Sequence, residues 1–262
     1  MRMVRLAPPG TLLQNQALLE LVAKSGAKTF CEIGPGDGEV SAALCRRGMK
    51  GVGIELSAPA AAVARSALQG EIQAGQFSLV EGDFMAMADR PSGFDLALSF
   101  MVMEHVEDDA AFAARLVNLV RPGGMVIAGV PGRMDRWGIE DGTAGHFRRY
   151  ERAGLRRVLV NAGLENVEVR SVSVPVANWT FHMSNFLIGR AGEASKLHLS
   201  QRERTETSGI RDIPFKTVFP APFKLILNPV AMYPFFLLQR LFYSTNLGLT
   251  LLGSGRRPQQ AT

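Results

Sequence analysis

The fold is decided by one short stretch, Glu32-Ile33-Gly34-Pro35-Gly36-Asp37-Gly38. It follows an apolar run at residues 28–33 and precedes a helical pattern at residues 39–47. Glycine lets a backbone turn sharply and lets a ligand approach without obstruction from a Cβ atom. Open α/β sheets bind ligands at the carboxyl ends of their strands, which is where this loop must lie. The stretch therefore predicts a ligand-binding turn between a buried strand and a helix.

The spacing of the glycines separates this loop from the dinucleotide-binding pattern G-x-G-x-x-G. The third glycine, Gly38, comes one residue early, and Glu39 occupies the position that this glycine should hold. Glu32 stands at the end of the strand, where a carboxylate repels a pyrophosphate and attracts a cationic ligand. A nicotinamide-dependent oxidoreductase is therefore disfavoured.

Short apolar runs alternate with helical patterns over the first two thirds of the 262 residues. We expect strands at 28–33, 51–56, 77–80, 94–100 and 124–130, and helices at 11–25, 39–47, 59–74, 108–120 and 151–162. This alternation predicts an α/β fold with a doubly wound, parallel sheet that is covered on both faces. Two later runs, 165–174 and 247–255, indicate further strands. The roughly 70 residues between these two runs do not fit the alternation, and they predict a mostly helical insertion over the C-terminal edge of the sheet.

Two further strand ends carry side chains that suit a nucleoside. Glu55 ends an apolar strand 23 positions after Glu32, close to the ~20-residue spacing at which an acid meets ribose hydroxyls. Asp83 follows the third strand and can accept a hydrogen bond from an adenine amino group. The neighbouring Phe84 can contact the face of the base. We expect these side chains to meet the glycine loop at one edge of the sheet.

Together with the fourth strand, which ends at Ser99 and Phe100, these segments resemble class I S-adenosylmethionine-dependent methyltransferases of the small-molecule group with the E-x-G-x-G-x-G loop. The resemblance covers residues 10–175 and resumes at 246–257. It implies a doubly wound, Rossmann-like, seven-stranded methyltransferase sheet with a helical insertion before the last strand. The methyltransferase core would comprise residues 1–175 and 246–257, and residues 176–245 would form an apolar and basic helical insertion that acts as a substrate lid or cap.

The resemblance also implies S-adenosyl-L-methionine as the cofactor. It implies these cofactor-binding residues: Glu32, Gly34, Gly36 and Gly38 at the methionine part, Glu55 and Leu56 at the ribose, Asp83 and Phe84 at the adenine, and Ser99 and Phe100 near the reactive end. Because the sulfonium carries an activated methyl group, such an enzyme mainly aligns an attacking O, N or C atom and excludes water.

Candidate catalytic residues lie just past the fourth strand and in the loop after the fifth strand. Glu104, His105 and His146 are the candidate general bases. A resembling subgroup, the quinone-ring O-methyltransferases, has E-x-x-E-H past the fourth strand and can bind a divalent metal there. Met101 stands where the first Glu of that pattern belongs, so we expect no metal site. The alternative for His105 is a packing or capping role at the following helix.

Candidate substrate-binding residues are Arg148, Tyr150 and Trp179. Arg148 can hold an anionic group through two parallel hydrogen bonds. Alternatively, it pairs with Asp141 or Glu140 and orders its own loop.

The formal charge of +5 is unevenly distributed. Residues 1–189 carry 19 basic and 20 acidic side chains, whereas residues 190–262 carry 10 and 4. The basic segment is rich in aromatic side chains, which favours a membrane surface or an amphiphilic substrate over a nucleic acid. The fourth strand also lacks the N/D-P-P-Y/F pattern of base-flipping methyltransferases. Peripheral membrane contact through residues 214–244 and a simple helical cap remain alternatives.

The sequence thus predicts a methyltransferase for a small, hydrophobic or amphiphilic molecule. The alternative is a non-catalytic protein that binds S-adenosylmethionine as an accessory or membrane-surface interaction protein. Two cysteines, Cys31 and Cys45, are too few for a disulfide framework, and we find neither a secretory signal nor a membrane-spanning run. We therefore expect a cytoplasmic protein, with peripheral membrane association as an open alternative. The substrate and the oligomeric state are left open.

Overall fold

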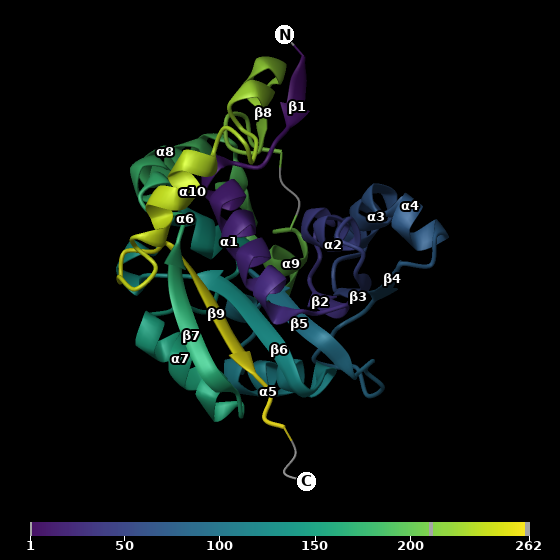
Figure 1. Ribbon diagram of the computed structural model, residues 1–262. Coiled ribbons are helices and arrows are strands. Elements are labelled where there is room, and N and C mark those ends of the chain that lie inside the picture. The colour runs from purple at the N-terminus through teal and green to yellow at the C-terminus, as the bar shows by residue number, and fades with distance from the viewer. Residues whose placement is uncertain (1, 210–211, 260–262) are drawn as a thin grey trace.

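The computed structural model describes residues 2–209 and 212–259. Its centre is a seven-stranded sheet with strand order β4-β3-β2-β5-β6-β9-β7 (Figure 1). The strands are β2 (Thr29–Ile33), β3 (Lys50–Glu55), β4 (Phe77–Glu81), β5 (Phe94–Phe100), β6 (Val120–Pro131), β7 (Glu165–Val172) and β9 (Thr250–Arg256). Strand β9 runs antiparallel between β6 and β7, while the other pairings are parallel. The expected α/β, doubly wound, Rossmann-like seven-stranded sheet is confirmed, including the late insertion of its last strand.

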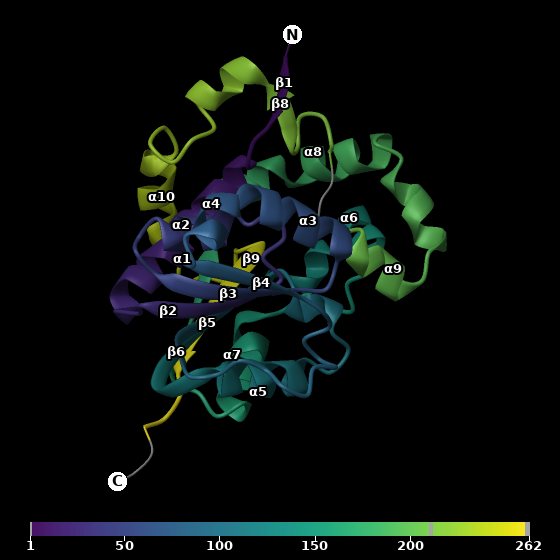
Figure 2. The same ribbon diagram turned by 90° about the vertical axis from the view of Figure 1, so that its right-hand side faces the viewer.

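Helices cover both faces of this sheet (Figure 2). One face packs against α1 (Pro9–Ser25), α2 (Glu39–Cys45) and α3 (Ala58–Ala67), and the other against α5 (Asp109–Leu119) and α7 (Arg152–Asn161). Neighbouring strand residues alternate between the two core layers, as Phe30 and Cys31 do. This alternation explains why the strands are apolar on both sides.

One expected helix, at residues 59–74, is divided in two. The backbone leaves the helical conformation at Leu68, which separates α3 from α4 (Gln69–Gln73). The Leu68 side chain is fully buried in the core layer beneath α2. A Cβ atom at Gly38 would lie 2.9 Å from its Cδ1 atom, so this glycine provides the space that Leu68 fills.

The insertion at 176–245 is mostly helical, as expected, but it is not purely so. Its described part, which leaves out residues 210 and 211, contains α8 (Val176–Arg190), η3 (Glu193–His198), α9 (Gln201–Glu206), β8 (Val218–Pro220), η4 (Ala221–Leu225) and α10 (Tyr233–Arg240). Strand β8 pairs antiparallel with β1 (Met3–Arg5), a two-stranded sheet that the sequence analysis missed. The first residues of the chain therefore join the insertion rather than the core to which we assigned them.

The insertion is also anchored in the core itself. Met232 lies directly before α10 and Phe236 lies within it. Both side chains are buried in the core layer that also contains α1. The amide of the buried Gln239 donates to the carbonyl oxygen of Leu13, and its side-chain oxygen accepts from the backbone of Ser173. The segment is thus part of the folded domain. Within the described residues, every helix is too short or too polar to cross a membrane.

Candidate functional site

A large pocket of about 850 Å³ opens at the carboxyl ends of β2, β3, β5 and β6. Its glycine-loop half is lined by Glu32, Gly34, Gly36, Glu55, Leu56, Asp83 and Phe84. Its insertion half is lined by Thr180, Phe181, Met183, Ser184, Leu187, Phe215, Phe219, Phe223, Ile226 and Leu227. The first half contains three acidic side chains, and the second half is mostly apolar.

The glycine loop has the backbone conformation that requires glycine. Gly34 and Gly36 have φ angles of +73° and +59°, in the left-handed region. A Cβ atom at Gly34 would lie 2.5 Å from Cγ2 of Val102, so a side chain has no room there. Both glycines line the pocket, as expected. Gly38 is different, because the described pocket wall does not include it and its role is to make room for Leu68.

Glu55 is held in place by the backbone around it. It is 7% exposed, and its two carboxylate oxygens accept hydrogen bonds from the amides of Gly36 and Ser57, each at 3.0 Å. Each oxygen retains a further lone pair toward the pocket. The carboxylate is therefore fixed beside the glycine loop, with acceptor capacity left for a ligand.

Glu32 is also buried, with 2% of its surface exposed, and accepts a hydrogen bond from Ser41 Oγ at 2.5 Å. Its pKa is raised to about 8, mainly by burial and also by the nearby Asp37 and Glu55, while the hydrogen bond from Ser41 opposes the rise. Without a cation nearby, this carboxyl group is largely protonated at neutral pH. A positively charged ligand beside this carboxyl group would favour its ionised form.

The other expected cofactor-binding residues divide into two groups. Asp83, Phe84, Leu56 and Phe100 line the pocket, and Asp83 is fixed by the amide of Met85, which donates to its Oδ1 at 2.8 Å. Ser99 is fully buried and is absent from the described pocket lining. It lies one residue before Phe100, and successive strand residues point to opposite faces of the sheet. The structure therefore favours Phe100 alone at this strand end.

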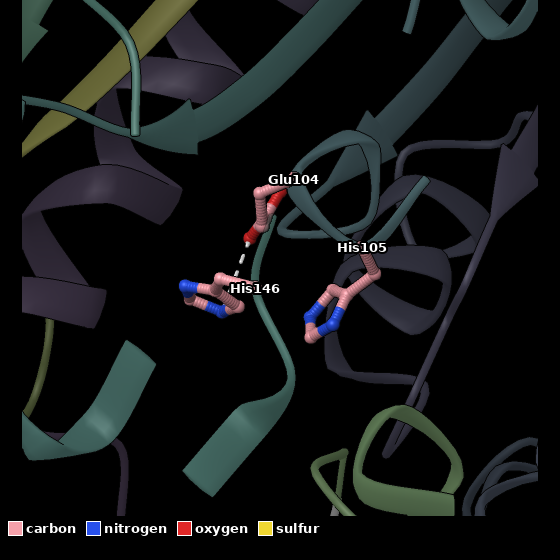
Figure 3. A group of neighbouring side chains, drawn as sticks. All are labelled: Glu104, His105 and His146. Atoms are coloured by element: carbon pink, nitrogen blue, oxygen red, sulfur yellow. Dashed lines mark ion pairs between the residues drawn. The ribbon is translucent and has the colours of Figure 1, made fainter. Parts of the chain in front are cut away.

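Three expected catalytic residues, all of which line the pocket, lie close together (Figure 3). Glu104 and His105 lie on η1 (Met103–His105), directly after β5, and His146 follows α6 (Ile139–Ala144). One ligand-type atom from each of the three lies within 4.8 Å of the other two. The rings of His105 and His146 meet edge to face with centroids 4.6 Å apart, and Nδ1 of His105 lies 3.3 Å from Thr205 Oγ1.

The surroundings of these residues control their charge. Glu104 is completely buried, and burial raises its pKa to about 7 although the nearby His146 opposes the rise. His146 Nε2 lies 3.9 Å from Glu104 Oε1, and its Nδ1 lies 2.8 Å from Asp141 Oδ1. Asp141 is also buried and accepts from Arg149 at 2.8 Å. Sequence reasoning missed Arg149, although it lies within the run that contains His146, and it considered Asp141 only as a partner for Arg148.

The expected substrate-binding residues lie elsewhere. Arg148 pairs with Asp109 at 2.9 Å rather than with Asp141 or Glu140, so that prediction is wrong. Tyr150 donates to the same Asp109 at 2.9 Å and is buried against α5 and α7. Both are outside the described pocket lining, because their strand-end loop turns them toward α5.

Trp179 is 69% exposed on α8 and is also outside that lining. Its helical neighbours Thr180 and Phe181 face the pocket instead. Helix periodicity could have separated these faces, but only if the direction of the core had been known.

Comparison with known proteins supports the fold. Residues 31–128 match the family model described as a methyltransferase domain. A ubiquinone biosynthesis O-methyltransferase from Stutzerimonas stutzeri is 32% identical over 107 residues, which cover 41% of this chain and 45% of that protein. An uncharacterised methyltransferase from Mycobacterium bovis is 32% identical over 112 residues, covering 43% and 55%. This chain therefore spans about half the length of the curated relatives that it matches.

Solved structures are similar over most of the chain. A phosphoethanolamine N-methyltransferase from Haemonchus contortus, in complex with S-adenosyl-L-methionine, has a TM-score of 0.57 and 16% identity, covering 94% of this chain and 52% of that one. The [4+2]-cyclase SpnF has a TM-score of 0.56 and 16% identity, covering 93% and 81%. The chain thus has the Rossmann-like α/β fold of methyltransferases, with a methyltransferase-domain match over residues 31–128.

Proposed function

We propose that this protein transfers a methyl group from S-adenosyl-L-methionine to an O, N or C atom of a small, hydrophobic or amphiphilic molecule. The methyltransferase-domain match supports the reaction class, and the cofactor bound to the Haemonchus contortus enzyme supports the cofactor. Fold alone does not fix a reaction, since a cyclase shares it. The proposal therefore depends on the pocket.

The observation that carries the proposal is the fixed carboxylate of Glu55 beside the glycine loop. Its oxygens are held by the amides of Gly36 and Ser57 and can accept from two adjacent hydroxyls, as a ribose offers. Asp83 lies in the same half, where an adenine amino group can donate to it. Glu32 completes this half with a carboxyl group whose ionisation a sulfonium or ammonium group favours.

The insertion half would hold the acceptor molecule. Its lining includes the aromatic residues Phe181, Phe215, Phe219 and Phe223, which bury apolar surface and exclude water. Glu104, His105 and His146 line the same pocket, and we propose that this cluster positions the acceptor atom and favours the loss of its proton. A non-catalytic accessory protein would need the glycine-loop half but would not need these three groups together.

Calorimetric titration of the full chain with S-adenosylmethionine tests the cofactor assignment. We expect binding, and we expect Glu55→Ala to weaken it by more than about tenfold, because two charge-assisted hydrogen bonds are lost. Glu81→Ala is the matched control, since Glu81 is an exposed residue at a neighbouring strand end that pairs with Arg65. No binding by the native protein would overturn the proposal.

We also propose that residues 214–244 contact a membrane surface. Exposed apolar side chains gather here, among them Leu225 (79% exposed), Val230 (83%) and Leu241 (75%). Residues 214–244 contain three basic side chains, Lys216, Lys224 and Arg240, and no acidic ones. An apolar segment whose own formal charges are all positive suits an anionic bilayer. Ile226 and Phe215 are both exposed and pocket-lining, so the pocket mouth lies beside this surface.

Flotation with vesicles that contain anionic lipid tests this contact. Deleting the segment would remove Met232 and Phe236 from the core, so point substitutions are preferable. We expect the native protein to float with the vesicles, and a variant with Leu225→Ser, Val230→Ser and Leu241→Ser to lose most of the bound fraction. Val63→Ser with Val160→Ser is the control, because these residues are exposed apolar positions elsewhere on the domain. Absence of native flotation would contradict the contact.

A further inference from the structure

Glu104 differs from the other buried acids of the pocket. Glu32 accepts a hydrogen bond from Ser41, and Glu55 accepts two from backbone amides. Both carboxylate oxygens of Glu104 are buried and have no hydrogen-bond partner among the described residues. Buried polar atoms without partners are rare in folded proteins, and an ion is one of the explanations for them. The carboxylate thus has its full acceptor capacity available.

Two imidazole rings border the same small volume as these oxygens (Figure 3). They come from different parts of the chain: His105 is the neighbour of Glu104 on η1, and His146 follows α6. Two histidines and one carboxylate that project from two separate segments of the chain into one pocket form a donor set suited to divalent transition metals. Each of the three residues also lines the pocket, so a bound cation would remain accessible to a substrate.

His146 is oriented by a second layer of contacts. Its Nδ1 is 2.8 Å from Asp141 Oδ1, which leaves Nε2 on the side of Glu104. Arg149 binds the same Asp141 and offsets its charge. A carboxylate that accepts from the distal nitrogen of a histidine is the usual support of a metal-binding histidine. The arrangement therefore fixes the nitrogen that a cation would need.

We propose that Glu104, His105 and His146 bind one divalent transition-metal cation in the pocket. His146 supplies the third ligand that the sequence pattern lacked, because Met101 replaces the first Glu of E-x-x-E-H. This proposal replaces our expectation of no metal site, which considered only residues adjacent in sequence. Cation binding itself does not require methyl transfer, but its use there rests on the proposed function. A bound divalent cation lowers the pKa of a hydroxyl group that it contacts.

The competing arrangement contains no cation. In it, a protonated His146 lies between Glu104 and Asp141 and balances their charge. Such a cluster has no specific affinity for a metal, so direct binding measurements distinguish the two arrangements without any knowledge of the substrate.

Titration of the full chain with Mn²⁺, followed by electron paramagnetic resonance, tests the proposal. We expect one site per chain. Glu104→Gln, His105→Gln and His146→Gln should each weaken Mn²⁺ binding by at least about 100-fold, and Asp141→Asn by about 10- to 100-fold. His182→Gln is the matched control, because His182 lies on α8 outside the cluster. Visible absorption of added Co²⁺ gives a second readout that is sensitive to the histidine ligands.

The possible results separate this proposal from the proposed function. If the native protein takes up no Mn²⁺ or Co²⁺ specifically, or if the three variants bind as well as the native protein, the metal site is refuted. Calorimetry with S-adenosylmethionine on the same samples tests cofactor binding, and therefore the proposed function, independently of metal binding. The two tests are independent because Glu55 and the glycine loop do not belong to the cluster. Thermal unfolding of each variant identifies any loss that is due to misfolding, and His105→Gln, at a position that is only partly buried, then remains as the decisive variant.

Discussion

The two halves of the pocket are built in different ways. In the glycine-loop half, the ends of neighbouring parallel strands bring Glu32, Glu55 and Asp83 together, and backbone amides fix two of these acids. In the insertion half, side chains from α8, β8 and η4 converge over the sheet, and several are partly exposed. A strand end fixes a side chain through local sequence and sheet register, whereas a loop or lid fixes it through tertiary packing. We therefore expect the first half to be rigid and the second to be adaptable.

The largest expected effect is on stability, and it comes from comparing a glycine of the sheet with a glycine of the insertion. A Cβ atom at Gly51, in β3, would lie 2.2 Å from the ring of Phe30, which is completely buried. Overpacking of this kind destabilises by about 1–3 kcal/mol. Gly189, in α8, has its nearest atom at 4.0 Å, and alanine is favoured over glycine in a helix by up to about 1 kcal/mol. Chemical denaturation should show a lower free energy of unfolding for Gly51→Ala, and an unchanged or higher one for Gly189→Ala. Equal losses at both sites would show that the insertion is packed as tightly as the core.

A second prediction concerns the buried acid of the glycine-loop half. Burial raises the pKa of Glu32 from 4.5 to about 8. Between these values the unfolded chain ionises while the folded protein stays protonated, so Glu32 lowers the stability of the native protein as pH rises from about 4.5 to about 8. Glu32→Gln removes this effect and keeps an acceptor for Ser41.

The measurement is the free energy of unfolding of both proteins from pH 5 to pH 9, without ligand. The stability of Glu32→Gln relative to the native protein should increase by at least ~1 kcal/mol over this range, since each pKa unit corresponds to about 1.4 kcal/mol. Glu165→Gln, at an exposed position that begins β7, should show no such trend. A constant difference between Glu32→Gln and the native protein would mean that Glu32 is already ionised at neutral pH.

The same distinction explains what the sequence could predict. The positions of the strands along the chain, the glycine loop, Glu55 and Asp83 follow from apolar runs and from residues at their ends, which are local signals. The contact of His146 with Glu104 joins two segments that are 42 positions apart in the sequence. The periodicity of apolar residues cannot predict such a contact. Arg148 was assigned the wrong partner for a similar reason, because the direction in which its loop turns depends on the packing of α5. The pairing of β1 with β8 could not be predicted, because a strand of three residues is too short to show an alternation of apolar and polar residues.

The smallest expected effect tests whether the insertion half is held closed. Lys216 forms an ion pair with Glu140 of α6, and both side chains line the pocket, so the pair connects the insertion to the core across the mouth. Partly exposed pairs contribute up to about 1 kcal/mol, and Lys216→Gln should therefore speed amide hydrogen exchange in residues 213–220 by about two- to fivefold. Lys224→Gln, an exposed lysine of the same segment, should leave the rate unchanged. If neither variant changes the exchange rate, packing alone holds residues 213–220 against the core. The difference in rigidity between the two halves of the pocket would then be smaller than we expect.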